Sequence, residues 1–539
     1  MFHGEGRKDE AMMASRLSAV ILVLVLAGWQ GASAYTHEKL SVKFLEYQDG
    51  TFALAKEQNK PVFMLISAVW CHWCHVFEEG ALASEKVYSY LNKNFINVFI
   101  DADARRDLLA RYQAKTLPYI VFLNPDGSIL RKYGGVLDAE DFLGLLKTLS
   151  KKVSSGEPDG EAEDQAAFSY SPPSRFSASA IREIDAVYKE IFQENFDKEE
   201  YGLGGGKKYL LPETFLYFID DAKGKKNEFT KMVDETLKKA VGAIYDNVEG
   251  GFFRYAETHD WRVPHYEKML DVNSSALSLL LKANALSPSS ALSDAARGTA
   301  GYLSSNLFDD DIGAFLSFQV ADTSYYRLPA SRREKTEKPD VIRKVFVDTL
   351  SISMARLLDT LKYTHDEKFA DKVKRSIRFL ADMMEREKNV YHYYLPDEKK
   401  WFIKGTLADH ANLALLFAKS YRIFKKPEHL RLARETLGYA RSKFFDAKLG
   451  IYKEGSLADL PSMEYLLGLN STIAMAWLEI SKVEQDKEGL EIAKNILRYF
   501  SGMADLLGER SWDARDFGFM EAYAKYLSAD QLYLVYLEK

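Results

Sequence analysis

The sequence predicts a multi-domain protein in which an N-terminal α/β domain is followed by an all-α domain built as an (α/α)6 toroid. Three observations support this prediction. Strand and helix signals alternate over residues 36–150, strand signals nearly vanish after residue 175, and a short motif recurs between the later helices. With 539 residues, the chain is long enough for two or more substantial cores.

The N-terminal part carries the signals of a sandwich with a mixed central sheet. Asn124-Pro125-Asp126-Gly127 is a strong turn signal, so we expect the runs on either side of it to pair as a hairpin. Helical patterns separate most of the expected strands. Short apolar runs typical of buried strands occur at residues 61–66, 95–100 and 119–123, residues 129–133 are expected as the hairpin partner, and the helical patterns lie near residues 50–59, 75–92, 105–114 and 138–150.

The first 34 residues have the pattern of a secretory signal peptide. Arg16 precedes the apolar run Leu17–Ala27, and Ala32-Ser33-Ala34 matches a cleavage site. The run is shorter than the roughly 20 apolar residues that span a bilayer. We therefore expect an exported protein, periplasmic or extracellular, with no stable membrane span after cleavage. An uncleaved N-terminal anchor is the alternative.

The composition fits a soluble globular protein and argues against a nucleic-acid-binding class. Hydrophobic residues make up 47% of the chain and charged residues 28%, the formal net charge is -6, and no polybasic stretch is present. Residues 151–174 are polar and end at Pro172-Pro173, which predicts a linker. The expected domains are therefore residues 35–150 and 175–539.

The part after the linker indicates helices joined by equivalent turns. The pattern aromatic-Asp-x-x-x-Gly-x-aromatic occurs at residues 245–252, 308–315 and 445–452, each time after a helix. Six helical hairpins with such a repeat favour a closed toroid, and an open solenoid is the alternative. The 3.6-residue apolar period appears in about twelve stretches, near residues 177–195, 212–222, 228–246, 269–284, 290–307, 345–362, 366–386, 406–423, 427–443, 462–482, 486–503 and 518–537.

The strongest chemical signal is the run from Trp70 to Cys74. Cys71 and Cys74 are the only two cysteines of the chain, and a pair so close closes almost no loop, so a redox role explains it better than a structural one. We expect Cys71 at a helix N-terminus and partly exposed, where the helix dipole lowers its pKa. Cys74, one turn on, is expected to be the resolving thiol. His72 should stabilise the Cys71 thiolate further.

A proline strengthens this interpretation. Leu117-Pro118 precedes the third expected strand, where thioredoxin-type folds place a cis-proline facing the disulfide. Together these signals predict a thioredoxin-like domain that acts on protein thiols or disulfides and needs no cofactor. The expected catalytic residues are Trp70, Cys71, His72, Cys74 and Pro118.

Two other interpretations of the cysteine run were weighed. Cys71-His72-Trp73-Cys74-His75 also matches C-x-x-C-H, the attachment pattern of c-type haem, but haem needs an apolar helical pocket and this run lies at a strand–helix junction. A zinc site of two cysteines and two histidines is disfavoured because four ligands within five residues cannot surround one ion tetrahedrally. We therefore expect no metal.

The chain resembles the family of spermatogenesis-associated protein 20 and its bacterial relatives. The resemblance rests on Cys71–Val76, Pro118, Gly204–Lys208, Tyr245–Phe252 and, most specifically, the run Trp261–Leu270, which is similar to the family's W-x-V-P-H-F-E-K-M-L. It covers nearly the whole mature chain. It implies a thioredoxin-like domain joined to an (α/α)6 domain of the six-hairpin-glycosidase type.

Candidate site residues in the toroid are expected at one mouth of the ring, where loops and helix starts meet. Paired carboxylates there could act as general acid and base on a glycoside, and a histidine pair could move a proton on a sugar. The alternative is that Asp246 caps a turn while His265 and Glu267 form a buried polar cluster. The candidates are Asp246, His265, Glu267, Asp409 beside His410, and Glu464.

Three functions remain open from the sequence. The chain could be a redox enzyme for protein thiols whose toroid binds a carbohydrate or protein partner. It could instead be a glycan-active hydrolase or epimerase with an accessory redox domain, or a non-catalytic scaffold. Fold alone does not decide between them.

Overall fold

The computed structural model describes residues 40–47, 50–114, 116–155, 176–454, 463–502 and 517–537. The signal peptide expected at residues 1–34 and most of the expected linker lie outside these ranges. Within the described ranges, no helix is both long and apolar enough to cross a membrane. Residues Leu40–Lys539 form one compact unit, although the sequence predicts two domains within it.

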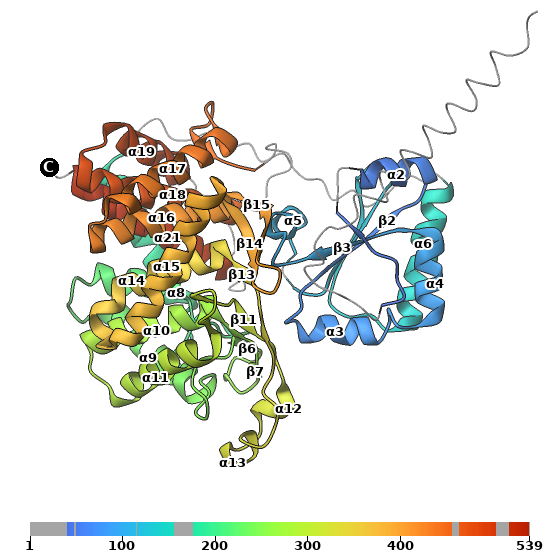
Figure 1. The fold of residues 1–539 in the computed structure, drawn as a ribbon, viewed down its shortest axis with the longest axis horizontal. Helices are drawn as coiled ribbons and strands as arrows, with labels where there is room; N and C mark the ends of the chain where they lie inside the picture. Colours follow the sequence, from blue (N-terminus) through green and yellow to red (C-terminus); the bar gives the residue numbers. More distant parts are fainter. Residues whose placement is uncertain are drawn as a thin grey trace, which may run out of the picture. The chain divides into compact units, whose positions relative to one another are not determined.

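The N-terminal sheet has five strands in the order β1-β3-β2-β4-β5 (Figure 1). β1, β3 and β2 are parallel to one another, β4 is antiparallel to its neighbour β2, and β5 is antiparallel to β4. A mixed sheet was expected, and four of its strands coincide with the predicted strands to within one residue; the edge strand β1 was not predicted. The strands are β1 (Leu45–Glu46), β2 (Val62–Ser67), β3 (Ile96–Asp101), β4 (Tyr119–Leu123) and β5 (Ile129–Gly134).

Helices surround this sheet, and the central strand β2 is buried along its whole length. Phe63 and Leu65 join Phe77 of α3 and Phe142 of α6 in one core, while the alternate residues of β2 face the other side. The single helix predicted at 75–92 is two helices, and α6 runs five residues beyond its predicted end into the expected linker. The helices are α2 (Thr51–Gln58), α3 (His72–Glu79), α4 (Glu85–Asn94), α5 (Arg106–Arg111) and α6 (Ala139–Ser155).

The remaining described residues form six helical hairpins, each an outer helix followed by an inner one. The inner helices are α8 (Pro212–Asp221), α10 (Leu270–Leu286), α14 (Val347–Thr364), α16 (Leu407–Phe424), α18 (Met463–Glu484) and α21 (Phe517–Leu537). Each packs against the next, and α21 packs back against α8. The ring is therefore closed, which confirms the toroid and rules out the open solenoid.

The outer helices cover this ring, and their bounds agree with the predicted periods to within a few residues. They are α7 (Ala178–Asn195), α9 (Glu228–Ala243), α11 (Ser290–Tyr302), α15 (Glu367–Glu387), α17 (Pro427–Phe444) and α19 (Lys487–Ser501). A short π-helix, η1 (Leu303–Leu307), extends α11. Because every outer helix leads into an inner one, the inner helices all begin at the same end of the ring, called the toroid mouth below.

The repeated motif forms the same turn at each of its three positions. The Asp side chain accepts the backbone N–H two residues on, at Val248, Asp311 and Lys448. The N–H of each motif glycine bonds back to the Asp carbonyl, and the glycines have φ angles of 77°, 71° and 73°. That conformation favours glycine, which explains its place in the motif. These turns connect outer to inner helices at the toroid mouth.

Short strands also occur between the helices, contrary to the prediction that strands vanish here. The longest pair is β14 (Tyr391–Leu395) with β15 (Lys400–Lys404), and β13 (Val345–Phe346) adds to it. The others are β6 (Tyr255–Ala256), β7 (Pro264–His265), β8 (Lys268–Met269), β9 (Phe308–Asp309), β10 (Ala314–Phe315), β11 (Phe318–Gln319), β12 (Val341–Ile342), β16 (Phe445–Asp446) and β17 (Ile451–Tyr452); two four-residue helices, α12 (Thr323–Tyr326) and α13 (Ala330–Arg333), lie among them.

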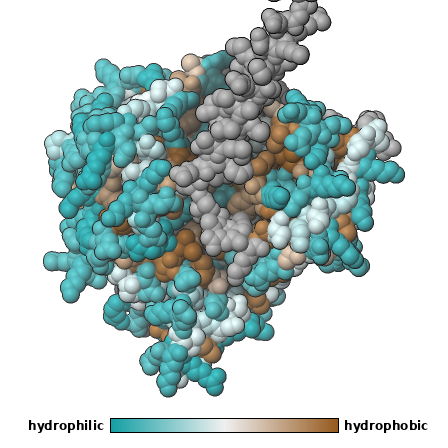
Figure 2. All heavy atoms as spheres, turned by 45° about the vertical axis from the view of Figure 1, so that its right-hand side comes forward, coloured by the Kyte–Doolittle hydropathy of each residue, from teal (hydrophilic) through white to brown (hydrophobic). Residues whose placement is uncertain are grey.

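Most of the face drawn in Figure 2 is hydrophilic, with brown apolar areas between the charged residues. Two of the large apolar side chains exposed in the described residues belong to the helix of the cysteine pair, namely Trp73 at 50% and Val76 at 36%. The helix that carries the cysteines therefore presents an apolar surface to solvent.

Candidate functional site

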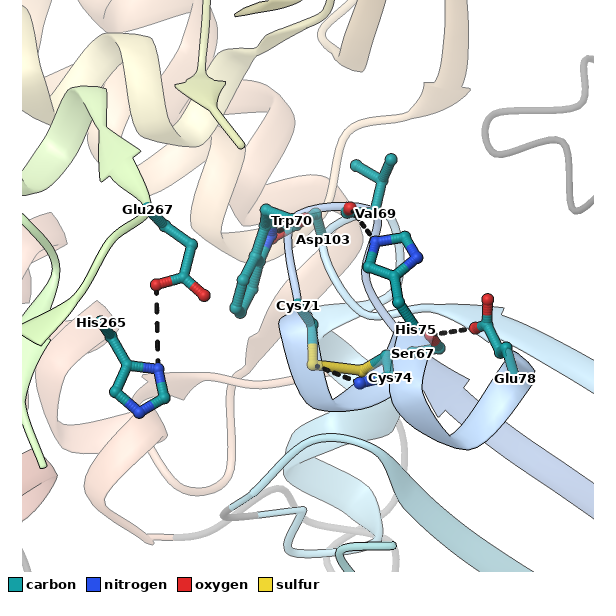
Figure 3. Close-up of a disulfide and its surroundings, with 10 residues drawn as sticks. All are labelled: Ser67, Val69, Trp70, Cys71, Cys74, His75, Glu78, Asp103, His265 and Glu267. Atoms are coloured by element: carbon teal, nitrogen blue, oxygen red, sulfur yellow. Dashed lines mark hydrogen bonds and ion pairs between the residues drawn. A yellow bond between two sulfur atoms is a disulfide. The ribbon is translucent and has the colours of Figure 1, made fainter. Parts of the chain in front are cut away.

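The cysteine pair lies where strand β2 passes into helix α3. Cys71 is the N-cap of α3, and its Sγ accepts the backbone N–H of Cys74 at 3.2 Å. Cys71 and Cys74 form a disulfide (Figure 3). A sulfur in the N-cap position lies at the positive end of the helix dipole, beside backbone N–H groups that have no partner within the helix. This position favours a thiolate on Cys71 once the disulfide is reduced.

Three more of the predicted residues surround the pair. Trp70 is buried and donates its indole N–H to Asp103 at 2.6 Å. The Leu117–Pro118 peptide bond is cis, and Tyr119 pairs with Ile66, so Pro118 lies at the same end of the sheet as Ser67, where β2 ends and leads toward Cys71. The ring of His72 makes an edge contact with Trp73, and His72 is exposed. The predicted set therefore gathers at one end of the sheet.

The expectation that Cys71 is partly exposed is wrong for the disulfide form. Cys71 is 5% exposed and Cys74 is fully buried. Trp70, immediately before Cys71, is also only 5% exposed, because the guanidinium of Arg254 lies 4.1 Å from the centre of its ring. Arg254 comes from the toroid part of the chain, so that part helps to cover the redox pair.

A buried carboxylate on α3 was missed by the sequence analysis. Glu78 follows Cys74 by four residues, so the two side chains share a face of the helix. It accepts a hydrogen bond from Ser67 at 2.9 Å. The i, i+4 spacing of an acidic residue after a redox cysteine is the signal that could have identified it. The Glu78 carboxylate is thus held at the end of β2, where the strand leads toward the cysteine pair.

Asp103, which bonds Trp70, is a second buried acidic group near the redox centre. Burial, and then repulsion from Asp101, raises the pKa of Asp103 to about 6. The indole N–H of Trp70 and the nearby cation Arg106 partly offset this effect. Asp103 therefore holds the indole N–H of Trp70, while Arg254 packs on the face of the same ring.

His265 and Glu267 come together, as the sequence predicted. His265 Nδ1 lies 3.8 Å from Glu267, and its Nε2 lies 2.9 Å from Glu257. Its ring stacks on Tyr255 at 4.2 Å. Glu267 is 2% exposed, and its Oε2 has no hydrogen-bond partner among the described residues.

This pair is linked to the redox centre through its neighbours. Arg254 lies over both the Trp70 and the Tyr255 rings. In Figure 3, Trp70 stands between the disulfide and the side chains of His265 and Glu267. The toroid candidates and the cysteine pair therefore border the same tryptophan.

Asp246 belongs to another cluster. It caps the first repeat turn, as the structural alternative in the sequence analysis held, and it bonds Lys268 at 2.6 Å and Arg333 at 2.8 Å. Burial alone would raise the pKa of Asp246, but the two cations hold it below its usual value. A carboxylate so fully paired is poorly suited to proton transfer.

Asp409 is likewise occupied. Its carboxylate accepts hydrogen bonds from Thr406, from the backbone N–H of Asp348 and from Nδ1 of His392, the last at 2.9 and 3.0 Å. The neighbouring His410 bonds the Thr406 carbonyl, and burial lowers its pKa. The side chain of Glu464, the remaining candidate, lies outside the described residues.

One group of side chains has the spacing of a metal site. The donor atoms of Asp348, His392 and Asp409 lie within 4.8 Å of one another, and all three residues are buried. Both ring nitrogens of His392 are engaged, however, since Nε2 bonds the Asp103 carbonyl at 2.8 Å. Burial would lower the pKa of His392, but Asp409 and then Asp348 raise it to about 9. A protonated imidazole has no lone pair for a metal, so the cluster fits an ion-pair network better.

This network predicts a stability that depends on pH. A group whose folded pKa is raised stabilises the protein fully below its unfolded pKa, and this contribution is lost as pH rises through the folded pKa. For His392 the window runs from 6.5 to about 9, which corresponds to on the order of 3 kcal/mol. In urea unfolding, the free energy of unfolding of the wild type should therefore fall between these pH values, and that of His392→Gln should not fall in the same way. Parallel curves for the two proteins would contradict this prediction.

Comparison with known proteins supports both parts of the chain. The family model Thioredox_DsbH, described as "Protein of unknown function, DUF255", matches residues 29–130. The (α/α)6 part is similar in fold to a D-mannose isomerase, with a TM-score of 0.51 and 12% identity over 68% of this chain and 100% of that one. A cellobiose 2-epimerase from Spirochaeta thermophila gives a TM-score of 0.50 and 12% identity over the same shares. The chain therefore combines a thioredoxin-like domain with a helical toroid.

Curated relatives also match in sequence. "Uncharacterized protein B0495.5" of Caenorhabditis elegans is 29% identical over 267 residues, covering 45% of this chain and 36% of the relative. Spermatogenesis-associated protein 20 of Rattus norvegicus is 28% identical over 317 residues, covering 53% of this chain and 40% of the relative. The aligned part spans only about two fifths of these relatives. These alignments confirm the resemblance to spermatogenesis-associated protein 20 that the sequence motifs indicated.

Proposed function

We propose that this protein is a thiol–disulfide oxidoreductase whose working pair is Cys71 and Cys74. The observation that carries the proposal is the disulfide at the N-cap of α3, where the Cys74 N–H already bonds the Cys71 sulfur. The same N–H groups and helix dipole that lie beside this sulfur stabilise a thiolate when the bond opens. The sheet, the cis-proline and Trp70 complete the thioredoxin-like setting.

The proposed exchange transfers two electrons. In one direction the Cys71 thiolate attacks a partner disulfide, forms a mixed disulfide and releases one partner thiolate. The Cys74 thiolate then attacks Cys71 Sγ, which closes the Cys71–Cys74 disulfide and releases the second partner thiolate. The exposed Trp73 and Val76 give an apolar surface on which a peptide can rest.

Equilibration in glutathione buffers tests the proposal. Redox cysteine pairs of this type have midpoints from roughly −270 to −120 mV, whereas structural disulfides lie below about −300 mV. We expect a midpoint in the first range, and in its more oxidising half because His72 favours the thiolate. The reduced fraction is measured by acid quench, alkylation and mass spectrometry. A disulfide that stays intact through the whole range would assign the pair a structural role.

A sugar-active toroid is the second candidate, and it rests on the His265–Glu267 pair. Glu267 is buried with an unbonded oxygen beside a histidine, in a part of the chain whose fold is similar to that of a D-mannose isomerase. Aldoses and disaccharides offered to the purified protein test this candidate. Turnover that persists without the cysteine pair would place the activity in the toroid.

A further inference from the structure

The segment from Asp101 to Arg106 joins the redox end of the sheet to the toroid part of the chain. It begins at the end of β3 and reaches the first residue of α5. Asp101 bonds Lys344 at 3.0 Å, and Arg106 bonds Asp348 at 2.8 Å and Thr349 at 3.1 Å. Both toroid partners in the ion pairs are buried, since Lys344 is 3% and Asp348 1% exposed.

Two carboxylates that hold this segment, one directly and one through His392, lie at the toroid mouth. Asp348 is the second residue of inner helix α14, and Asp409 is the third of inner helix α16. His392 on β14 bridges the two parts, because Nε2 bonds the carbonyl of Asp103 and Nδ1 bonds Asp409. The carboxylates that mark the start of these two inner helices are thus used to hold the redox segment.

The same segment controls the position of Trp70. Asp103 accepts the indole N–H, and Arg254 of the toroid part packs on the ring face. Trp70 and Cys71 are each 5% exposed, whereas Trp73 on the outer side of α3 is 50% exposed. Access to Cys71 is therefore limited in this closed arrangement, and the contacts to Trp70 are part of what covers it.

We propose that residues Asp101–Arg106 form a latch that docks the redox centre against the toroid mouth and that its release admits a thiol partner to Cys71. The inference rests on the thiol exchange proposed above. The latch is a segment of this chain. It is held by the ion pairs Asp101–Lys344 and Arg106–Asp348 and by the His392 bridge. Opening the latch frees Asp103, lets Trp70 move off Arg254, and exposes the Cys71 sulfur.

The rate at which dithiothreitol reduces the oxidised full-length protein tests the latch. A dithiothreitol thiolate attacks Cys71 Sγ and displaces the Cys74 thiolate; its second thiol then closes the cyclic reagent disulfide and releases the Cys71 thiolate. In Arg106→Ala the second-order rate should rise about tenfold because the closed state is weakened. Asp101→Asn, which keeps an acceptor for the Asp103 N–H, should give a smaller rise in the same direction.

Arg375→Ala is the matched control. Arg375 belongs to outer helix α15 and pairs with Asp310 at 2.7 Å. Neither residue contacts the redox segment. Its rate should equal that of the wild type. Equal rates in the wild type, Arg106→Ala and Asp101→Asn, all folded by circular dichroism, would overturn the latch. A faster rate in the latch variants, with a glutathione midpoint below the catalytic range, would keep the latch and reject the proposed enzyme function.

Discussion

Replacing Cys74 with serine should trap Cys71 in a mixed disulfide with its thiol partner, and replacing Cys71 should abolish exchange. Cys71 occupies the N-cap of α3, whereas Cys74 lies inside the helix and is fully buried. Attack by a second thiol held in place has an effective molarity of about 10⁵ M or more, so loss of Cys74 should prolong the mixed disulfide at least about a thousandfold. Glutathione disulfide serves as the partner, and mass spectrometry after acid quench detects the adduct.

The reduced wild type provides a second measurement of the same assignment. At pH of about 6, iodoacetamide should label Cys71 much faster than Cys74, because the helix start lowers the pKa of the N-cap thiol. Cys71→Ser, the matched variant, should accumulate no adduct and should lose exchange to the background rate. If both single variants form adducts equally and both thiols label at one rate, the pair is not a thioredoxin-type centre.

The fold was largely predictable because the sequence signals are strong and local. The 3.6-residue period predicted the twelve helices of the six hairpins, apolar runs predicted β2 to β4, and the turn signal before it predicted β5. The expected helix start at Cys71 is confirmed, because Cys71 is the N-cap of α3, where its sulfur takes the place of the usual serine or aspartate oxygen. Most of the short strands of the toroid were missed because a strand of two residues is too short to show a period.

The candidate site was predictable where its residues are close in sequence, or where a proline precedes an expected strand, as Pro118 does. Cys71, Cys74, Trp70 and the His265–Glu267 pair come from two short runs. Lys344, Arg254 and His392 were missed because their partners lie far away in the chain, as in the pair of Arg106 with Asp348. For His392 a signal existed, since Tyr391-His392-Tyr393-Tyr394 before Pro396 is typical of a hairpin strand.

The same distance explains why Asp246 looked catalytic from the sequence. Its partners Lys268 and Arg333 are 22 and 87 residues away, so the sequence showed an acidic residue in a loop and not a neutralised one. The repeat gives a direct comparison, because Asp446 makes the same turn at an equivalent loop. Among the described residues, Asp446 forms an ion pair with Lys453 alone, at 3.2 Å, and its side chain is 22% exposed.

Asp246→Asn should therefore destabilise the toroid far more than Asp446→Asn. Asparagine keeps the side-chain acceptor of the turn in both variants, so the turn itself is matched. In Asp246→Asn, however, Lys268 and Arg333 lose the carboxylate between them while they stay buried, at 0% and 6% exposed. Breaking such a buried pair costs about 3–5 kcal/mol.

The pair at Asp446 is only partly buried, and its loss should cost no more than about 1 kcal/mol. Urea unfolding followed by far-ultraviolet circular dichroism measures both changes against the wild type. Nearly equal losses would mean that the turn, and not the buried charge, determines the role of Asp246. An unchanged stability of Asp246→Asn together with a loss of sugar turnover would return Asp246 to the active-site candidates, because a carboxylate needed only for chemistry can be replaced by its amide without loss of packing.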